Sequence, residues 1–177
     1  MMKQKLIAAS LVLLLAVPFL FGGCGGGDKG GEGFAIYLTK TNIPPASMLM
    51  LSHLETANLP FLYGGDIVSY DWSTHIIELT QGAFNRINHM IVPTSGTSFI
   101  VCVDKNPIYW GAFWTPSSSQ SFDGVVIMAG NAPMNVQGVT NLIQIKLGYP
   151  GGSFYSGNDP RSNPVIKTAL EKAGKLK

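Results

Sequence analysis

Alternating apolar and polar side chains predict β-strands through much of the chain. In NLIQIKLG (141–148) the apolar residues Ile143, Ile145 and Leu147 alternate with polar ones, which is typical of a strand with one buried face. Runs rich in β-branched and aromatic residues, bounded by turn-forming residues, predict further strands. These lie at 34–40, 66–72, 75–79, 97–104, 107–114 and 124–129.

Capping residues and helical spacing predict three helices between these strands. Early prolines followed by good helix formers predict the first, from about Pro45 to Ala57. Thr80 is suited to cap a second helix, whose apolar positions continue at helical spacing to Ile91. Asn163, followed by a proline, begins a third helix, and Gly174 ends it.

The order of these elements predicts an α+β fold in a single domain, residues 34–177. Helices are expected on one face of a mainly antiparallel sheet. The strands at 97–104 and 107–114 are expected to form a hairpin across the turn DKNP. A segment of this length is sufficient to bury a hydrophobic core.

The N-terminal segment has a different pattern, that of a secretory signal peptide. Two lysines precede the apolar run 6–21, and two glycines then lead to Cys24. This junction, LFGGC, resembles the lipobox of bacterial lipoproteins, although Phe21 stands where leucine is usual. The resemblance implies removal of residues 1–23, acylation of Cys24, and a lipid anchor in the cell membrane or outer membrane, facing outside the cytoplasm. An ordinary secreted protein with an incidental cysteine is the alternative.

Composition after this junction predicts a flexible tether and a nearly neutral domain. Residues 24–33 are rich in glycine, which has maximal backbone freedom and nothing to bury. The chain has 12 Lys and Arg against 10 Asp and Glu, and Lys3 and Lys5 are removed with the signal. The net charge is then near zero, which excludes the strong positive field of nucleic-acid-binding proteins. The expected partners are the membrane, through lipid on Cys24, and an envelope protein or peptide.

The middle of the chain also resembles a known extracytoplasmic domain. DIVSYDWSTHIIELTQGAFNRI (66–87), followed by GTSFIVCVDKNPIYWGAF (96–113), is similar to the large extracytoplasmic domain of the bacterial export subunit SecD. The matching features are a threonine cap, a glycine-alanine pair that opens a helix, and an apolar strand before a tight turn. The resemblance implies a ferredoxin-like centre that contacts polypeptide. SecD domains hang between membrane spans, whereas a lipid anchor is expected here, so an export role is not carried over.

Titratable residues form no recognisable metal or catalytic motif. His53, His75 and His89 have none of the spacings of metal ligands, and each is expected at the surface or its boundary. The sequence has no GxSxG serine motif and no lysine-containing phosphate loop. No metal or cofactor is therefore predicted, and the chain is not expected to be an enzyme. A hydrolase assembled from distant residues is the alternative, and it requires a pocket that holds a histidine or carboxylate with a perturbed pKa.

Three carboxylates, Asp66, Asp71 and Glu78, fall around one predicted hairpin. Such groups can perform acid-base chemistry or bind calcium. However, Asp71 adjoins a turn and Asp66 follows two glycines, so capping of the local backbone explains both. Glu78 alternates outward between apolar neighbours. Cys102 lies in a continuous apolar run and is expected to be a buried, inert side chain.

Aromatic residues concentrate at 108–114 and supply the candidate binding surface. Strand alternation places Trp110 and Trp114 on one face. Phe122 and the serine-rich loop before it follow directly, and Arg161 is a candidate for anion recognition. The candidate binding surface is therefore Trp110, Trp114, Phe122 and Arg161.

The same alternation places Ile108 and Ala112 beside the tryptophans, and Tyr109 and Phe113 on the opposite face. Gly111 lacks a side chain, so that a backbone or a ligand can approach closely. Two ordinary core faces are one interpretation, and an exposed aromatic surface is the other. The sequence favours a non-catalytic module that binds peptide or protein in the cell envelope, with a small-molecule solute binder as a further alternative.

Overall fold

Nine strands and two α-helices make up the part of the chain that the structure describes. The computed structural model describes residues 33–48, 53–130, 134–136 and 138–177, so Cys24, the signal segment and the tether up to residue 32 lie outside it. The strands are β1 (Phe34–Leu38), β2 (Leu62–Tyr63), β3 (Ile67–Asp71), β4 (Ile76–Leu79), β5 (Thr97–Val103), β6 (Asn106–Trp114), β7 (Phe122–Met128), β8 (Met134–Val136) and β9 (Val139–Tyr149). The helices are α1 (Gln81–Asn88) and α2 (Pro164–Lys172).

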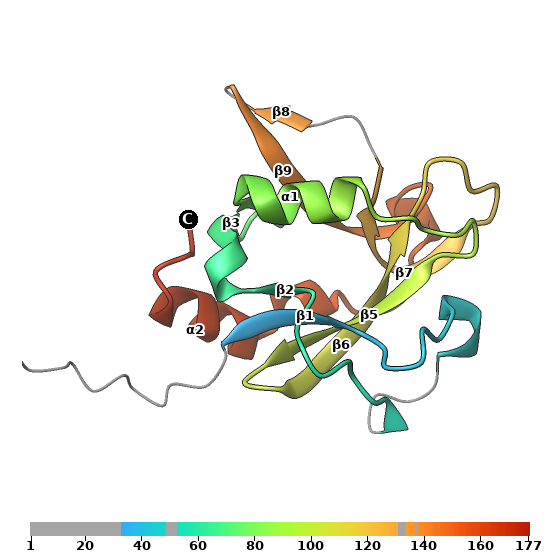
Figure 1. Cartoon of the computed structure of the whole chain (residues 1–177), viewed down its shortest axis with the longest axis horizontal. Coiled ribbons are helices and arrows are strands. Elements are labelled where there is room, and N and C mark those ends of the chain that lie inside the picture. The colour runs from blue at the N-terminus through green and yellow to red at the C-terminus, as the bar shows by residue number, and fades with distance from the viewer. Residues whose placement is uncertain (1–32, 49–52, 131–133, 137) are drawn as a thin grey trace, which may run out of the picture.

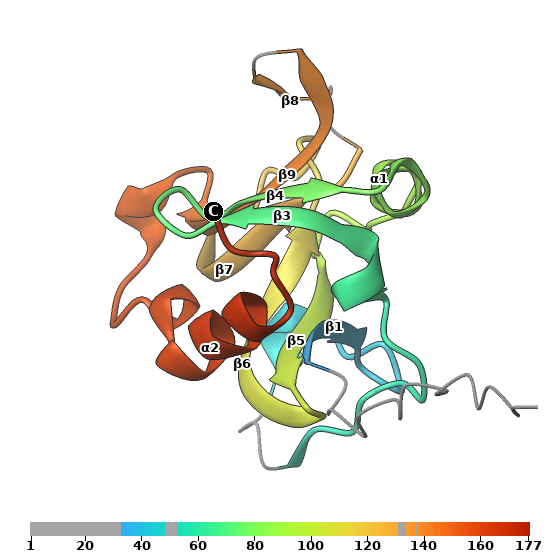
Figure 2. The same ribbon diagram turned by 90° about the vertical axis from the view of Figure 1, so that its left-hand side faces the viewer.

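The strands form one curled sheet in the order β2-β1-β5-β6-β7-β9-β4-β3, with β8 paired to β9. The pairings are antiparallel except that β6 and β7 run parallel. Figures 1 and 2 show β8 and the adjoining part of β9 projecting from the body. The α+β class and the mainly antiparallel sheet are confirmed.

The connection between β2 and β3 explains why the sheet curls. These strands lie at opposite ends of the strand order, yet only the 3-10 turn Gly64–Asp66 separates them in the chain. Because an extended residue spans at most about 3.3–3.6 Å, this turn bridges roughly 10 Å. The two sheet edges must therefore approach each other, and the sheet encloses an interior.

Both helices cover the interior face of this sheet. Ala83, Phe84 and Ile87 of α1 belong to the same buried cluster as Ile166 and Leu170 of α2. The helices lie well apart along the sheet, α1 near β4 and β9 and α2 near β1 and β5 (Figures 1 and 2). The prediction that the helices lie on one face is therefore confirmed.

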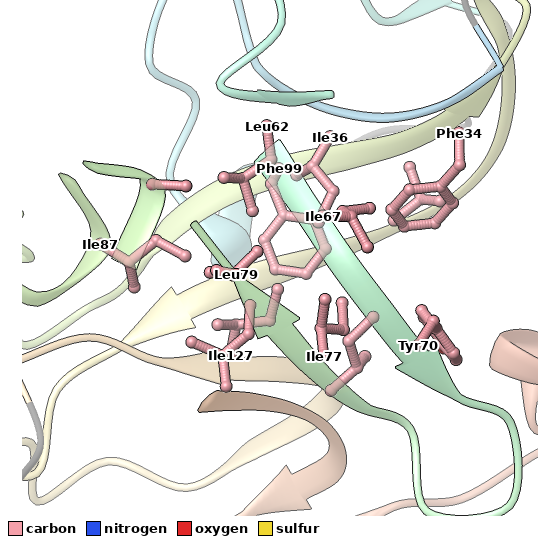
Figure 3. Packing of buried hydrophobic residues seen from close by; sticks show 14 of the residues in the cluster. Phe34, Ile36, Leu62, Ile67, Tyr70, Ile77, Leu79, Ile87, Phe99 and Ile127 are labelled. Atoms are coloured by element: carbon pink, nitrogen blue, oxygen red, sulfur yellow. The ribbon is translucent and has the colours of Figure 1, made fainter. Parts of the chain in front are cut away.

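The interior is filled by side chains from strands on both halves of the sheet. Figure 3 shows residues of β1, β3, β4, β5 and β7 converging around Phe99. Phe99 is fully buried and its ring lies 5.0 Å from that of Phe113. Each Å² of apolar surface that this cluster removes from water stabilises the fold by roughly 25 cal/mol.

Predicted turns and caps agree with the structure. The β5–β6 hairpin turns at Asp104 and Lys105, whose φ angles of 52° and 67° suit the tight turns that match strand twist. The Thr80 hydroxyl accepts from the Ala83 amide, and the Asn163 side chain accepts from the Val165 amide. The predicted helix starts are therefore confirmed, whereas α1 ends at Asn88, before Ile91.

The predicted helix from Pro45 to Ala57 is wrong in its described part. Pro45–Ser47 forms a 3-10 turn in place of an α-helix, and Met48 is already extended, with ψ at 129°. Thr56 instead forms an isolated antiparallel bridge with Thr39, just beyond β1. Met48 and Leu54, from the described part of this segment, pack on the outer face of the sheet.

A bulge changes the predicted alternation at one position. Val101 pairs with Tyr109 and Cys102 pairs with Pro107, so Ile108 is the extra residue. Ile108 consequently packs against the interior cluster and not beside the tryptophans. From Tyr109 to Trp114 the predicted alternation is confirmed, since Tyr109 and Phe113 face the interior while Trp110, Ala112 and Trp114 face outward.

The ferredoxin-like centre is not confirmed. In that arrangement the strands on either side of a helix are close neighbours in one sheet. Here β4 and β5, which flank α1 in the chain, have β6, β7 and β9 between them. Within the described ranges, neither helix has the length and apolar character needed to cross a bilayer.

Candidate functional site

The candidate aromatic residues form a row on the outer face of β6 and β7. The Trp114 and Phe122 rings stack at 5.0 Å with an interplanar angle of 13°. The Trp110 ring lies 5.9 Å from that of Phe122, and the Tyr149 ring of β9 lies 5.8 Å from that of Trp114. The structure thus brings together Trp110, Trp114 and Phe122, as the sequence suggested.

The two tryptophans differ in exposure. Trp114 is only 2% exposed, whereas Trp110 is half-buried against the small outer cluster around Ile100. A Cβ added to Gly96 would lie 2.4 Å from the Trp114 ring and 3.1 Å from Pro45. The Trp114 ring is therefore enclosed between Phe122 on one side and Gly96 on the other. It cannot contact a ligand unless these neighbours move.

The serine-rich loop, residues 115–121, connects the parallel strands. Because β6 and β7 run in the same direction, the chain must return across a face of the sheet between them. Ser118 holds the loop by donating to the Thr94 carbonyl at 2.6 Å, and Tyr149 donates to the Ser118 carbonyl at 3.2 Å. The loop is thus a crossover connection held by two hydrogen bonds, and one of them comes from Tyr149, which packs against Trp114.

A cleft opens where β6 and β7 separate. Their pairing extends only from Gly111 with Val125 to Trp114 with Met128, so β7 pairs with none of residues 106–110 of β6. The cleft has a volume of about 310 Å³ and is lined by Tyr109, Trp110, Asp123, Gly124, Val125, Tyr155, Ser156 and Pro160. Of the predicted surface, Trp110 lines this cleft.

Gly111 marks the end of the cleft at which the strands come into contact. A Cβ there would lie 2.5 Å from the Val125 carbonyl oxygen and 2.5 Å from the Phe99 ring. Close approach of a backbone at Gly111 is therefore confirmed, and that backbone belongs to β7.

Asp123 supplies the carboxylate of the cleft. One carboxylate oxygen accepts from the Ser156 amide at 2.7 Å, and the other accepts from the Ser156 hydroxyl at 2.6 Å. These hydrogen bonds hold the pKa of Asp123 below its usual range. The group is therefore a fixed negative charge at neutral pH.

Arg161 follows the cleft residue Pro160, but its guanidinium group is already bonded. It forms two hydrogen bonds to the Asp159 carboxylate, at 2.9 and 2.7 Å, and a third to the Ile145 carbonyl at 2.8 Å. Its side chain is 15% exposed. In this structure Arg161 fixes the C-terminal loop to β9 and does not join the aromatic row.

His75 differs from its expected surface position, because it is buried with 5% exposure. It lies in the β3–β4 turn with φ at 54°, a left-handed conformation uncommon for residues other than glycine. Its Nδ1 atom is 2.9 Å from the Tyr70 hydroxyl. Burial, followed by the positive charge of Arg161, lowers the pKa of His75, although Asp159 and Asp71 partly oppose this.

Acidification is expected to destabilise the fold through His75. Because its folded-state pKa is lowered, the unfolded chain takes up a proton first as the pH falls through about 6.5, the usual histidine value. The free energy of unfolding should therefore decrease below that pH. NMR titration of the imidazole Cε1 proton should give a midpoint below 6.5, and a midpoint at or above this value would contradict the burial effect.

A second cleft, of about 160 Å³, contains Asp71 and Glu78. Asp71 accepts from the Ser73 and Thr74 amides, and Glu78 accepts from Ser69 and Lys177. Capping by Asp71 is therefore confirmed. His75 lines neither this cleft nor the one between β6 and β7.

Asp66 has the capping role that was expected and a further partner. Its carboxylate accepts from the Tyr63 amide at 3.3 Å and from Arg86 of α1 at 2.6 Å. This ion pair fastens α1 to the short turn that closes the sheet. Among the described residues, no group of three histidine, cysteine or acidic side chains is arranged to hold a metal ion.

Sequence reasoning missed the side of the cleft that comes from the C-terminal loop. Tyr155, Ser156 and Pro160 reach β6 only because β7 pairs with β9, which leads into that loop. The loop's glycine, serine and asparagine content identified it as irregular, but no local pattern placed it against Trp110.

The Tyr109 hydroxyl is buried and has no hydrogen-bond partner among the described residues. Burial raises the pKa of Tyr109, so the phenol stays neutral.

Comparison with family models, with curated protein sequences and with solved structures finds no match to this chain.

Proposed function

We propose that this chain is a bacterial lipoprotein, anchored by lipid on Cys24, whose domain binds an extended polypeptide segment without altering it chemically. The N-terminal pattern of a charged start, an apolar run and two glycines before Cys24 supports the anchor. The cleft between β6 and β7 supports the binding role. The cleft does hold a carboxylate with a perturbed pKa, Asp123, but Ser156 donates to both of its oxygens. Because the buried His75 also lies outside the lining of this cleft, peptide binding is favoured over catalysis.

The observation that carries this proposal is that residues 106–110 of β6 do not pair with β7. Residues 106–110 continue as a strand while β7 pairs with β6 only from Gly111 onward. Extended peptides bind to such strand edges through main-chain hydrogen bonds, and adjacent pockets select side chains. Trp110 lies at this position and supplies a large, rigid contact surface.

Contacts within the row of aromatic residues restrict the movement of the Trp110 side chain. Its ring lies 5.9 Å from that of Phe122, at a tilt of 52°, and Phe122 is itself stacked on the enclosed Trp114. A side chain held in this way loses little conformational entropy when a ligand binds. The row therefore fixes the orientation of the residue that contacts the peptide.

The glycine-rich tether fits a domain that works close to a membrane surface. A flexible glycine-rich chain of the length predicted for the tether, residues 24–33, would have a root-mean-square span of roughly 17 Å. The cleft can then reorient relative to the bilayer while remaining near it.

A selection from randomised heptapeptides displayed on phage tests the proposal. The mature lipidated protein in nanodiscs is expected to enrich peptides over empty nanodiscs, and Trp110→Ala should remove most of that enrichment. Trp72→Ala is the matched control, since Trp72 is also half-buried but lies outside the cleft. Unfolding in urea must show that both variants are folded.

Two results would refute the binding proposal. The first is an absence of enrichment by the wild-type protein. The second is equal loss in Trp110→Ala and Trp72→Ala, which would show that the effect does not depend on the cleft.

A further inference from the structure

The lining of the cleft between β6 and β7 includes a negatively charged side chain and no positively charged one. Its lining residues include the aromatic Tyr109, Trp110 and Tyr155 and one carboxylate, Asp123, but no lysine, arginine or histidine. The neighbouring cation, Arg161, is held by Asp159. A bound segment therefore meets a negative charge among aromatic residues.

Asp123 has no cationic partner in the described part of the chain. The ion pairs found there join Lys40 to Glu55, Arg86 to Asp66, Arg161 to Asp159, and Lys177 to Glu78. Ser156 donates one hydrogen bond to each oxygen of Asp123. Because an ionised carboxylate has about four acceptor positions, roughly two remain for a ligand.

Aromatic rings and a fixed carboxylate together favour one kind of side chain. A cation above a tryptophan or tyrosine face is attracted by the ring quadrupole. The same cation is attracted to the carboxylate, and an arginine or lysine side chain also brings an apolar stem that can lie along the ring. Anionic side chains would meet repulsion from Asp123.

We infer that the cleft selects polypeptide segments that carry a lysine or arginine side chain, whose cation pairs with Asp123. This inference rests on the proposed function, since it specifies which peptides bind. Asp123 acts here as a specificity-determining residue, whereas Trp110 contributes to the binding of any segment.

Exposure limits the size of the expected preference. Asp123 is exposed, and exposed ion pairs and cation–π contacts each contribute modestly, so we expect about a fivefold preference for basic over neutral peptides. The preference should decrease with added salt, because salt screens exposed charges.

Selection from the same randomised heptapeptide library tests the inference when it is carried out on wild type and on Asp123→Asn in nanodiscs. The wild-type pool should be enriched in lysine and arginine by about fivefold over the input library. The Asp123→Asn pool should enrich peptides without that basic preference. Asparagine retains an acceptor for Ser156, and a urea unfolding curve confirms that the variant is folded.

The outcomes separate this inference from the proposed function. Peptides enriched by wild type without a basic preference would overturn the inference and leave peptide binding intact. A basic preference that persists in Asp123→Asn would also overturn it, since the charge would then act elsewhere. An absence of any enrichment would remove the proposed function and the inference together.

Discussion

Replacing Trp114 by alanine is expected to lower the free energy of unfolding by about 3–5 kcal/mol, the usual cost of removing a buried tryptophan. Trp114 is 2% exposed and is enclosed by Phe122, by Tyr149 and by the corner at Gly96. Because domains are stable by only about 5–15 kcal/mol, this is a large fraction of the total. Equilibrium unfolding in urea measures the loss.

Trp110→Ala is the matched comparison for this prediction. Trp110 is half-buried, so its removal exposes less apolar surface and leaves a smaller cavity. We expect a clearly smaller loss of stability than for Trp114→Ala. Equal losses in the two variants would show that the tryptophans do not have separate structural and binding roles.

Replacing Cys24 by serine is expected to abolish incorporation of a labelled fatty acid into the protein. The thioether to lipid requires the cysteine sulfur, and each buried methylene contributes about 0.8 kcal/mol to membrane attachment. Metabolic labelling with an alkyne fatty acid, followed by gel fluorescence, measures the change.

Cys102→Ala is the control for the lipidation experiment. Cys102 lies fully buried in β5, so this variant should be labelled as strongly as the wild type. Labelling that persists in Cys24→Ser would contradict the lipoprotein assignment. Loss of labelling in both variants would show that the effect is not specific to Cys24.

Strand positions could be predicted from the sequence because burial on one face imposes a period of two residues. The alternation in β9 is seen directly, with Ile143 and Ile145 buried and Lys146 exposed. The β5–β6 hairpin and the caps at Thr80 and Asn163 depend on neighbouring residues alone, and these predictions are confirmed.

Contacts between distant segments explain the principal errors. The apolar residues at 48–54 have a helical spacing in the sequence, but Met48 and Leu54 pack on the outer face of β1 and β5. Thr56, which was also predicted to be helical, forms a bridge with Thr39 instead. His75 packs against the Tyr70 and Trp72 rings, and its electrostatic neighbours Arg161 and Asp159 come from the far end of the sequence. No local pattern reports such contacts.

The candidate site was predictable only in part for the same reason. The aromatic residues of β6 are visible in the sequence, and alternation correctly placed Trp110 and Trp114 on one face. Their different exposures depend on the parallel pairing of β6 with β7, which brings Phe122 over Trp114. That pairing also opens the cleft and positions Asp123 next to Ser156.

The indole N–H signals of the tryptophans provide the most direct test of the central claim, that an extended peptide binds at Trp110. The chain has three tryptophans, Trp72, Trp110 and Trp114, each with its own indole signal. The lipidated protein in nanodiscs, labelled with ¹⁵N, would be titrated with the most strongly enriched heptapeptide. We predict that the Trp110 signal shifts saturably and by the largest amount, while the Trp72 and Trp114 signals change little. A Trp110 signal that stays unchanged at saturating peptide would contradict the account.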